Sequence, residues 1–332
     1  MQSGKYRGRF APSPTGPLHF GSLVTALGSY LQARSLRGEW LLRMEDIDPP
    51  RERAGAANDI LRVLDAYQLH WDGPVTYQSQ RQEYYEAALT QLSQQGDTFP
   101  CSCTRRSIRN AVAPSNLIVQ PTQNDNSDGN SDNNPSNGQV VYPGTCRAGL
   151  PPGTTARAVR LRVPAQGETD GHLGDASTGV FTDGLQGLQS TPLASTVGDF
   201  VVRRADGLYA YHLAVVVDDA DQHITEVVRG TDLLTSTAPQ RYLQKCLGYS
   251  HPHYCHLPIA TNQSGQKLSK QTFARAIDLQ NRGPTLLKAL DFLGQEPDPV
   301  LTGAAPVEIV AWAIENWVLT KIPKQNALYA DI

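Results

Sequence analysis

Near the N-terminus, a segment with the character of a strand is followed by apolar positions that have the spacing of a helix. Residues 5–11 (KYRGRFA) have the character of a short strand, and apolar side chains recur at helical spacing over residues 23–31. This pattern predicts a helix that begins near Ser22. Residues 40–44 (WLLRM) form a compact apolar run typical of a buried parallel strand, and a second amphipathic helix follows at 60–67.

This order of strand, loop, helix, strand and helix is the βαβ rhythm of an α/β fold with a doubly wound parallel sheet. Such sheets bind ligands at the carboxyl ends of their strands. Two polar segments fall there. The loop 12–16 (PSPTG) follows the first predicted strand, and the acidic residues Glu45, Asp46 and Asp48 follow the second. We therefore expect a ligand site at this end of the sheet.

The rest of the chain contains one polar insert and then returns to the pattern of a folded domain. Residues 113–139 are dominated by Asn, Ser, Asp and Gly and can bury little apolar surface, which predicts a mobile loop. Strand-like runs and a helix follow within 158–164 and 199–221. Two helical stretches, 286–294 and 307–318, predict a small α-helical part at the C-terminal end.

Composition excludes some classes of protein. The chain has 332 residues, of which 39% are hydrophobic, and its net charge is −3. It has no apolar run of signal-peptide type and none of the roughly 18–20 apolar residues that a membrane span needs. We therefore expect a cytoplasmic protein without a membrane partner. The charge balance gives no sign of nucleic-acid binding, which would require a local basic patch.

The segment RFAPSPTGPLHFGS contains the first candidate chemistry. One residue separates His19 from Gly21, just before the predicted helix. An imidazole and backbone N–H groups at a helix N-terminus can bind a triphosphate, because the helix dipole favours anions there. The alternative is a connection rich in proline and glycine with an incidental histidine.

The second candidate is KLSKQ at 267–271, which follows the flexible segment NQSGQ. On a mobile loop, Lys267 and Lys270 can close over a leaving pyrophosphate and neutralise the charge that develops. A solvated lysine pair is the alternative interpretation. The segment gains weight because it occurs in the same chain as the histidine motif.

Together these segments resemble the signature motifs of the class I glutamyl-tRNA synthetases. RFAPSPTGPLHFGS looks like their form of the HIGH motif, and KLSKQ looks like their KMSKS loop. YHLAVVVDDADQHITEVVRGTDLL is similar to the segment between the two. The resemblance extends over nearly all of residues 5–275, apart from the polar insert and a Gly/Ser-rich stretch near 166–195.

Within this family the resemblance is greatest to a short paralog that attaches glutamate to queuosine, a modified base in the anticodon of tRNA(Asp). It implies an aminoacyl-tRNA-synthetase-like ligase with a Rossmann-type catalytic core. The substrates would be L-glutamate, ATP with Mg²⁺, and tRNA(Asp) that carries queuosine, and we expect a monomer. Ser22 replaces the last histidine of the HIGH string, and Gln271 replaces the final serine of KMSKS. We expect activity to survive both departures, because His19, Gly21 and Lys270 are in place.

The resemblance also implies residue roles. His19 and Lys270 are the catalytic candidates, which stabilise the charged transition state when a glutamate carboxylate attacks the α-phosphate of ATP. Gly21 and Lys267 would bind ATP with them. Glutamate brings two carboxylates and an ammonium, so its site requires two cationic groups and one anion. Which arginine holds which carboxylate is not decided by the sequence. The positions that match the family's glutamate pattern are the cations Arg9 and Arg229, the anion Glu45, the neutral donors Ser13 and Tyr211, and Ala11.

Three of the five cysteines have the spacing of metal ligands. Cys101, Cys103 and Cys146 would supply three thiolates to a structural zinc site, which needs a fourth ligand. Tyr142 is the nearest candidate, and the Cys-x-Cys and Tyr-x3-Cys arrangement is similar to that of the short paralog. The 38 residues between Cys103 and Tyr142 exceed the family's usual spacing. Reduced free thiols are the alternative. The other two cysteines, Cys246 and Cys255, are interpreted as ordinary buried thiols.

These observations divide the chain into four parts. Residues 1–98 and 151–260 form the two halves of the catalytic domain. We expect residues 99–150 to form an inserted zinc-binding module, with a disordered loop predicted at 113–139. Residues 261–332 contain the KMSKS-like loop and the helical part.

Two rival functions remain open. Because 61 residues follow Gln271, too few for the large anticodon-binding region of a full glutamyl-tRNA synthetase, the ordinary reading of a whole tRNA is not expected. The rival within the class is a truncated glutamyl-tRNA synthetase that charges a tRNA 3′ end. The other is a non-catalytic regulator that binds glutamate or tRNA. The presence of Arg9, His19, Glu45 and Lys270 speaks against a regulator.

Overall fold

The first half of the central sheet is built from the N-terminal residues, as the apolar pattern predicts. The computed structural model describes residues 5–111, 140–165, 179–268 and 275–331. The first elements are β1 (Arg7–Phe10), α1 (Phe20–Ser35), β2 (Glu39–Met44), α2 (Ala56–Ala66) and β3 (Thr76–Tyr77). The strands are parallel and lie in the order β1-β2-β3.

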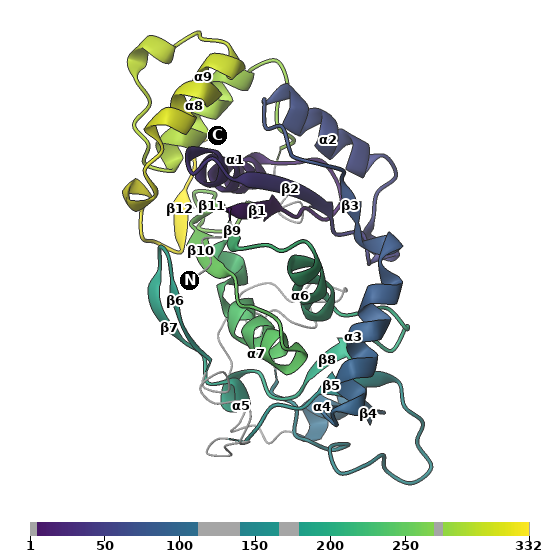
Figure 1. Cartoon of the computed structure of the whole chain (residues 1–332). Coiled ribbons are helices and arrows are strands. Elements are labelled where there is room, and N and C mark those ends of the chain that lie inside the picture. Colours follow the sequence, from purple (N-terminus) through teal and green to yellow (C-terminus); the bar gives the residue numbers. More distant parts are fainter. Residues whose placement is uncertain (1–4, 112–139, 166–178, 269–274, 332) are drawn as a thin grey trace.

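The second half repeats the pattern on the other side of β1. Its elements are α6 (Tyr211–Asp221), β9 (Glu226–Gly230), α7 (Thr237–Leu247) and β10 (His253–Leu257). Strands β9 and β10 are parallel. Thr225 joins the halves, because its N–H donates to the carbonyl of Arg7 at 3.0 Å. Strands β1 and β9 therefore lie side by side (Figure 1), and the strand order reverses between them. This confirms the predicted doubly wound fold.

Helices cover both faces of this sheet (Figure 1). One face packs on α1 and α2 and on the C-terminal helices α8 (Arg282–Phe292) and α9 (Pro306–Asn316), which confirms the predicted helical part. The other face is covered by α6 and α7. Trp40 of β2 is fully buried on the face that packs against α1, where its ring stacks on Phe10 and meets the Tyr30 ring edge-on. The apolar spacing of α1 thus faces the strand that follows it.

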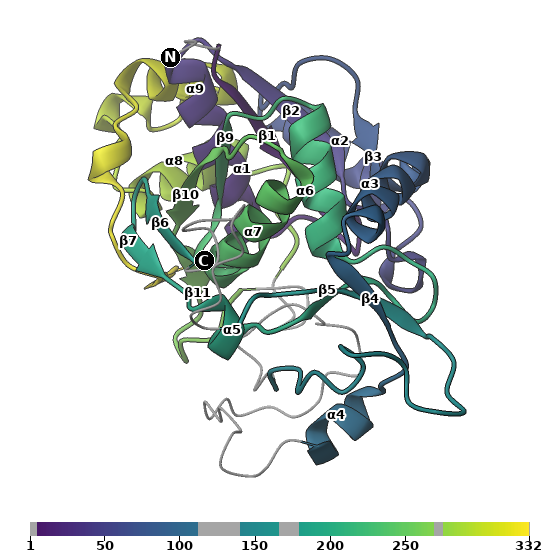
Figure 2. The ribbon, with the colours of Figure 1, turned by 60° about the horizontal axis from the view of Figure 1, so that its bottom comes forward.

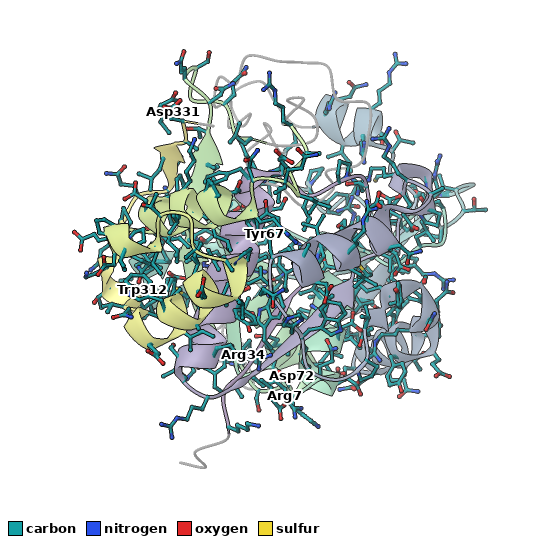
Figure 3. The ribbon with its side chains drawn as sticks, turned by 90° about the horizontal axis from the view of Figure 1, so that it is seen from above. Arg7, Arg34, Tyr67, Asp72, Trp312 and Asp331 are labelled. Atoms are coloured by element: carbon teal, nitrogen blue, oxygen red, sulfur yellow. The ribbon has the colours of Figure 1, made fainter. Side chains whose placement is uncertain are left out.

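Arg34, in the last turn of α1, lies beside Asp72 (Figure 3), and the pair connects the end of α1 to the start of β2. Arg34 Nη1 donates to Asp72 Oδ2 at 2.7 Å, and the backbone N–H of Trp40 donates to the same oxygen at 2.8 Å. One carboxylate therefore satisfies both a helix-end cation and a strand N–H.

A second, antiparallel sheet interrupts the two halves. It has the order β4-β5-β8, and its middle strand β5 begins at the predicted run 158–164. The strands of this sheet are β4 (Thr98–Cys101), β5 (Ala158–Leu161) and β8 (Phe200–Arg203), and the helices in this part of the chain are α3 (Gln82–Gln94) and α4 (Arg105–Ala111). In both Figure 1 and Figure 2, α4 lies at the end of the molecule away from α8 and α9. The polar insert 113–139 lies outside the described residues.

Smaller elements complete the described chain. They are the hairpin β6 (Val180–Asp183) and β7 (Gly187–Ser190), α5 (Leu193–Thr196), the parallel pair β11 (Ile259–Thr261) and β12 (Ala327–Tyr329), and 3-10 turns at Pro49–Arg51, Gln78–Gln80, Thr231–Ser236, Pro299–Leu301 and Leu319–Lys321. Within the described ranges, no helix combines the length and the apolar character needed to cross a membrane.

Candidate active site

A cavity of about 440 Å³ opens at the carboxyl ends of β1, β2 and β9, where the strand order reverses. This is the place where doubly wound sheets bind their ligands. Most of the residues predicted from the sequence line it. They are Arg9, Ala11, Ser13, His19, Gly21, Glu45, Tyr211, Arg229 and Lys267. Lys270 lies outside the described residues. The fold thus gathers segments that are as many as 258 positions apart, from Arg9 to Lys267, around one cavity.

His19 caps the N-terminus of α1. Its Nδ1 accepts the backbone N–H of Ser22 at 3.3 Å, so a neutral ring carries its proton on Nε2. Gly21 makes room for the ring, because a Cβ at this position would lie 3.3 Å from the imidazole. The cap therefore places Nε2 of His19 on the side of the ring opposite the hydrogen-bonded Nδ1, at a helix end that favours anions.

Glu45 is one of two acidic residues in the cavity wall, with Asp232, and it follows directly after β2. Burial raises the pKa of Glu45 to about 7, although the cations Arg43 and Arg9 act in the opposite direction. Its Oε1 lies 3.6 Å from Arg43 Nη2. The carboxyl therefore exchanges its proton near neutral pH, and a cationic ligand group would favour its ionised form.

Arg43 and two aspartates of α6 form a buried charged layer beneath the cavity that sequence reasoning missed. Arg43 Nη2 donates to Asp219 Oδ1 at 2.8 Å, and its Nε lies 3.7 Å from Asp218 Oδ2. Asp219 also accepts two hydrogen bonds from Arg9, at 3.1 and 3.4 Å. The signal was present in the two adjacent acids that follow the apolar run 213–217 of the same helix, because buried carboxylates require cationic partners.

Arg229, at the end of β9, is buried and is held in place by four groups. Its Nε donates to His256 Nε2 at 3.0 Å and its Nη1 donates to Gln240 Oε1 at 2.8 Å. Its Nη2 donates to the Leu233 carbonyl at 3.2 Å and to Thr237 Oγ1 at 2.9 Å. The sequence motif predicted Arg229 but not the groups that hold it, since they come from α7, β10 and the turn before α7.

Lys267 forms an ion pair with Asp232, another residue of the cavity wall. Its Nζ lies 2.5 Å from Asp232 Oδ2, and both residues line the cavity. Asp232 comes two positions after Gly230, where any Cβ would lie 2.4 Å from an Asp232 carboxylate oxygen. The glycine thus allows the carboxylate to turn back toward the lysine.

The three predicted cysteine ligands lie together at the start of the inserted sheet. The Sγ atoms of Cys101, Cys103 and Cys146 are all within 4.8 Å of one another, and this cluster could hold a metal ion. The Tyr142 hydroxyl lies 3.4 Å from Cys101 Sγ and 3.6 Å from Cys103 Sγ. Ligands in a tetrahedral zinc site with sulfur at about 2.3 Å are separated by about 3.8 Å. The four side chains therefore fit such a site.

The Tyr142 hydroxyl also accepts the backbone N–H of Cys146 at 2.8 Å. Burial raises the pKa of the Tyr142 phenol, so a metal ion would have to displace its proton. Cys246 and Cys255 are buried in the two main apolar cores, which confirms their interpretation as ordinary buried thiols.

Comparison with known proteins defines the class. The model of the catalytic domain of class I tRNA synthetases (E and Q) matches residues 5–285, so this cavity lies in a class I synthetase catalytic domain. A glutamate tRNA ligase from Elizabethkingia meningosepticum has the same fold, with a TM-score of 0.73 and 23% identity over 99% of this chain and 67% of that chain. Glutamate-tRNA synthetase from Elizabethkingia anophelis gives the same TM-score at 24% identity, over 98% of this chain and 68% of that chain.

Curated relatives narrow the class further. Glutamyl-Q tRNA(Asp) synthetase of Dechloromonas aromatica is 51% identical over 97% of both chains, and that of Chromobacterium violaceum is 50% identical over the same shares. The protein of Thiobacillus denitrificans with this name is 50% identical over 95% of this chain and 94% of its own. The chain described above belongs to the glutamyl-Q tRNA(Asp) synthetase family of class I synthetases.

Proposed function

We propose that this chain activates L-glutamate with ATP and transfers it to queuosine in the anticodon of tRNA(Asp). One observation carries the proposal. A single cavity at the switch point of the sheet has an anion-binding helix end at His19, an acid at Glu45 and a buried cation at Arg229. This arrangement matches a triphosphate beside an amino acid that has both charges.

In the first step a carboxylate oxygen of glutamate attacks the α-phosphorus of ATP. The P–O bond to the β-phosphate breaks, and glutamyl-adenylate and pyrophosphate form. His19 donates its Nε2 proton to a phosphate oxygen as a hydrogen bond, and Gly21 lets the start of α1 approach the phosphates. Lys267 and Lys270 neutralise the pyrophosphate as it leaves. Mg²⁺ arrives with ATP and offsets part of the phosphate charge.

Glutamate binds with its ammonium against Glu45 and a carboxylate against Arg229, while Ser13 and Tyr211 donate hydrogen bonds. In the second step a hydroxyl of the queuosine ring attacks the activated carbonyl. An ester forms, AMP leaves with the electron pair of the broken bond, and the hydroxyl proton passes to solvent. Because no covalent enzyme intermediate forms, we assign no nucleophile.

The RNA partner is supported by a local basic patch of the kind that the whole-chain charge does not reveal. The described residues 98–111 and 140–163 include seven arginines and no acidic residue. The exposed ones are Arg105, Arg106, Arg109 and Arg157. Such a patch can position phosphates of an RNA backbone without reading its sequence.

We also propose that residues 99–150 form a module held by one structural zinc ion. Cys101, Cys103, Cys146 and the Tyr142 oxygen would be its ligands, and the ion would stabilise a segment that has few apolar residues. The cluster lies outside the cavity lining, so the metal takes no part in the chemistry. The division of the chain at 98, 150 and 260 and its monomeric state remain predictions.

The proposal is tested in two stages. ATP–pyrophosphate exchange with glutamate, without tRNA, separates an enzyme from a non-catalytic binder. Transfer of labelled glutamate is then measured on two RNAs: queuosine-containing tRNA(Asp) without its 3′-terminal adenosine, and an unmodified transcript with an intact 3′ end. We expect label only on the first RNA. Label only on the transcript would identify a truncated glutamyl-tRNA synthetase instead.

A further inference from the structure

Arg229 is a buried cation whose direct partners are all neutral. Its side chain is 4% exposed, and its donors go to an imidazole, an amide, a backbone carbonyl and a hydroxyl. In the part of the chain that the structure describes, no carboxylate lies within ion-pairing distance of it. These contacts use four of its five N–H donors, which leaves one on Nη1 for a ligand in the cavity that Arg229 lines.

Arg9 shows the opposite arrangement in the same cavity wall. It is also 4% exposed, but its fork meets the Asp219 carboxylate through two donors. The charge of Arg9 is therefore compensated inside the protein, whereas the charge of Arg229 still lacks an anion in direct contact. Because a buried charge is costly without a partner, Arg229 has the stronger tendency to bind a ligand carboxylate.

The orientation of Arg229 depends on the proton of His256. The Arg229 Nε–H can only donate, so His256 Nε2 must accept and the imidazole proton must lie on Nδ1. His256 Nδ1 lies 2.6 Å from Asp183 Oδ2, which accepts this proton. All three side chains are at most 4% exposed. Burial lowers the pKa of His256 to about 4, although its hydrogen bond with Asp183 acts in the opposite direction, so the ring is neutral at physiological pH.

We propose that Asp183 and His256 are positioning residues that fix Arg229 toward the cavity without neutralising its charge. A carboxylate in the place of His256 would orient the guanidinium equally well, but it would also compete with the ligand carboxylate. A neutral imidazole avoids this competition. Asp183, which contacts His256 but not Arg229, selects the tautomer of the imidazole by accepting its Nδ1 proton. The inference deepens the proposed function, on which it rests, because it assigns the support of the glutamate-binding cation.

Asp183→Asn tests the relay sharply because the new amide can take only one orientation. Asp183 Oδ1 accepts the backbone N–H groups of Leu185, Gln186 and His256, at 3.0, 2.9 and 3.2 Å. In the asparagine variant this position must remain the oxygen, so the NH₂ group replaces Oδ2 and faces His256 Nδ1. The imidazole proton then moves to Nε2, where it opposes the Arg229 Nε–H.

We expect Asp183→Asn to raise the KM for glutamate in ATP–pyrophosphate exchange by about 10- to 100-fold, the range known for outer partners of metal-binding histidines. The KM for ATP should stay within about twofold. The matched control is Asp199→Asn. Asp199 is another buried acid with a backbone partner, because its Oδ1 accepts the Val163 N–H at 2.8 Å and Arg147 Nη1 at 2.6 Å, but it does not line the cavity. This control should leave the KM for glutamate unchanged.

A spectroscopic measurement keeps the inference testable even where a variant does not fold. Nitrogen-15 NMR of the histidine side chains distinguishes the two neutral tautomers, and His256 should show a protonated Nδ1 in the wild-type protein and a protonated Nε2 in Asp183→Asn. A wild-type ring protonated on Nε2 would overturn the relay. An unchanged KM for glutamate in a folded Asp183→Asn protein would do the same. Absence of exchange in the wild-type protein would refute the proposed function, while the tautomer measurement would still judge the relay.

Discussion

Glu45 Oε1, in the cavity wall, lies 3.6 Å from Arg43 Nη2. The two arginines near this carboxyl, Arg43 and Arg9, already have an aspartate partner. Arg43 and Arg9 share Asp219, and Asp218 lies 3.7 Å from Arg43 Nε. Glu45 is thus the carboxyl that the local cations do not fully compensate, which is why burial dominates its pKa. A substrate ammonium would supply the missing positive charge.

The first prediction concerns the pH dependence of glutamate binding. Because the pKa of Glu45 is raised to about 7, its carboxyl is largely neutral at pH 6 and largely ionised at pH 8. The KM for glutamate should fall about 10-fold between these values, as expected for one group that must lose its proton. ATP–pyrophosphate exchange measures it. Glu45→Gln should have a higher KM that no longer changes with pH, and a pH-dependent KM in this variant would assign the titration to another group.

The second prediction concerns the effect of the same carboxyl on stability. As pH rises, its ionisation should strengthen glutamate binding but lower the stability of the fold. The folded-state pKa of Glu45 lies above its ordinary value of 4.5, so between about pH 4.5 and 7 the folded protein binds more protons than the unfolded chain. Its contribution to the free energy of unfolding must therefore fall as pH rises through this window. The difference in unfolding free energy between Glu45→Gln and wild type should shift in favour of the variant by up to about 3 kcal/mol from pH 5 to pH 8. Urea unfolding at the two pH values gives the difference, and a constant difference would contradict it.

The third prediction concerns the loop lysine. Lys270→Ala should lower the rate of adenylate formation by about 100-fold or more and change glutamate binding little, because a lysine aimed at the leaving group acts mainly in the transition state. Lys324→Ala, which removes an exposed lysine far along the chain, is the control and should behave like wild type. An equal loss of glutamate affinity would place Lys270 in the amino-acid pocket instead.

The fourth prediction concerns the metal. One zinc ion per chain should co-purify, and Cys103→Ser should release it and destabilise the module at about 100–150. Tyr142→Phe keeps the ring and removes the oxygen, so zinc affinity should fall at least ~10-fold if the phenolate is a ligand. Metal analysis and competition with a chelator measure both effects. Full zinc retention in Tyr142→Phe would leave the three cysteines as ligands and move the fourth position to another group.

The fifth prediction concerns the polar insert. Deletion of 115–138 should leave the exchange activity and the thermal midpoint nearly unchanged, because its composition cannot support a core and loop-closure entropy depends only weakly on length. Thermal unfolding and zinc content of the shortened protein are the measurements. A loss of solubility or of zinc would show that the insert has a structural role.

Much of the fold could be predicted because the relevant signals are local. The helical spacing after Ser22 and the apolar run 40–44 each fixed an element, and their order predicted the doubly wound sheet that places the site. The histidine motif is also local, since His19 caps the same helix whose N-terminus would bind the phosphates. The cysteine and tyrosine spacing likewise predicted a cluster that the structure brings within ligand distance.

Neighbouring positions and contiguous strings along the chain predicted the first elements of the central sheet, the C-terminal helices, the motif residues and the family. Which charged side chains meet became known from the folded chain alone. Asp219 lies 210 positions from Arg9, and Asp183 lies 73 positions from His256, so no local pattern could pair them. The physical reason is that burial makes an ionised group depend on its nearest partner, and that partner is chosen by packing across the sheet rather than by spacing along the chain.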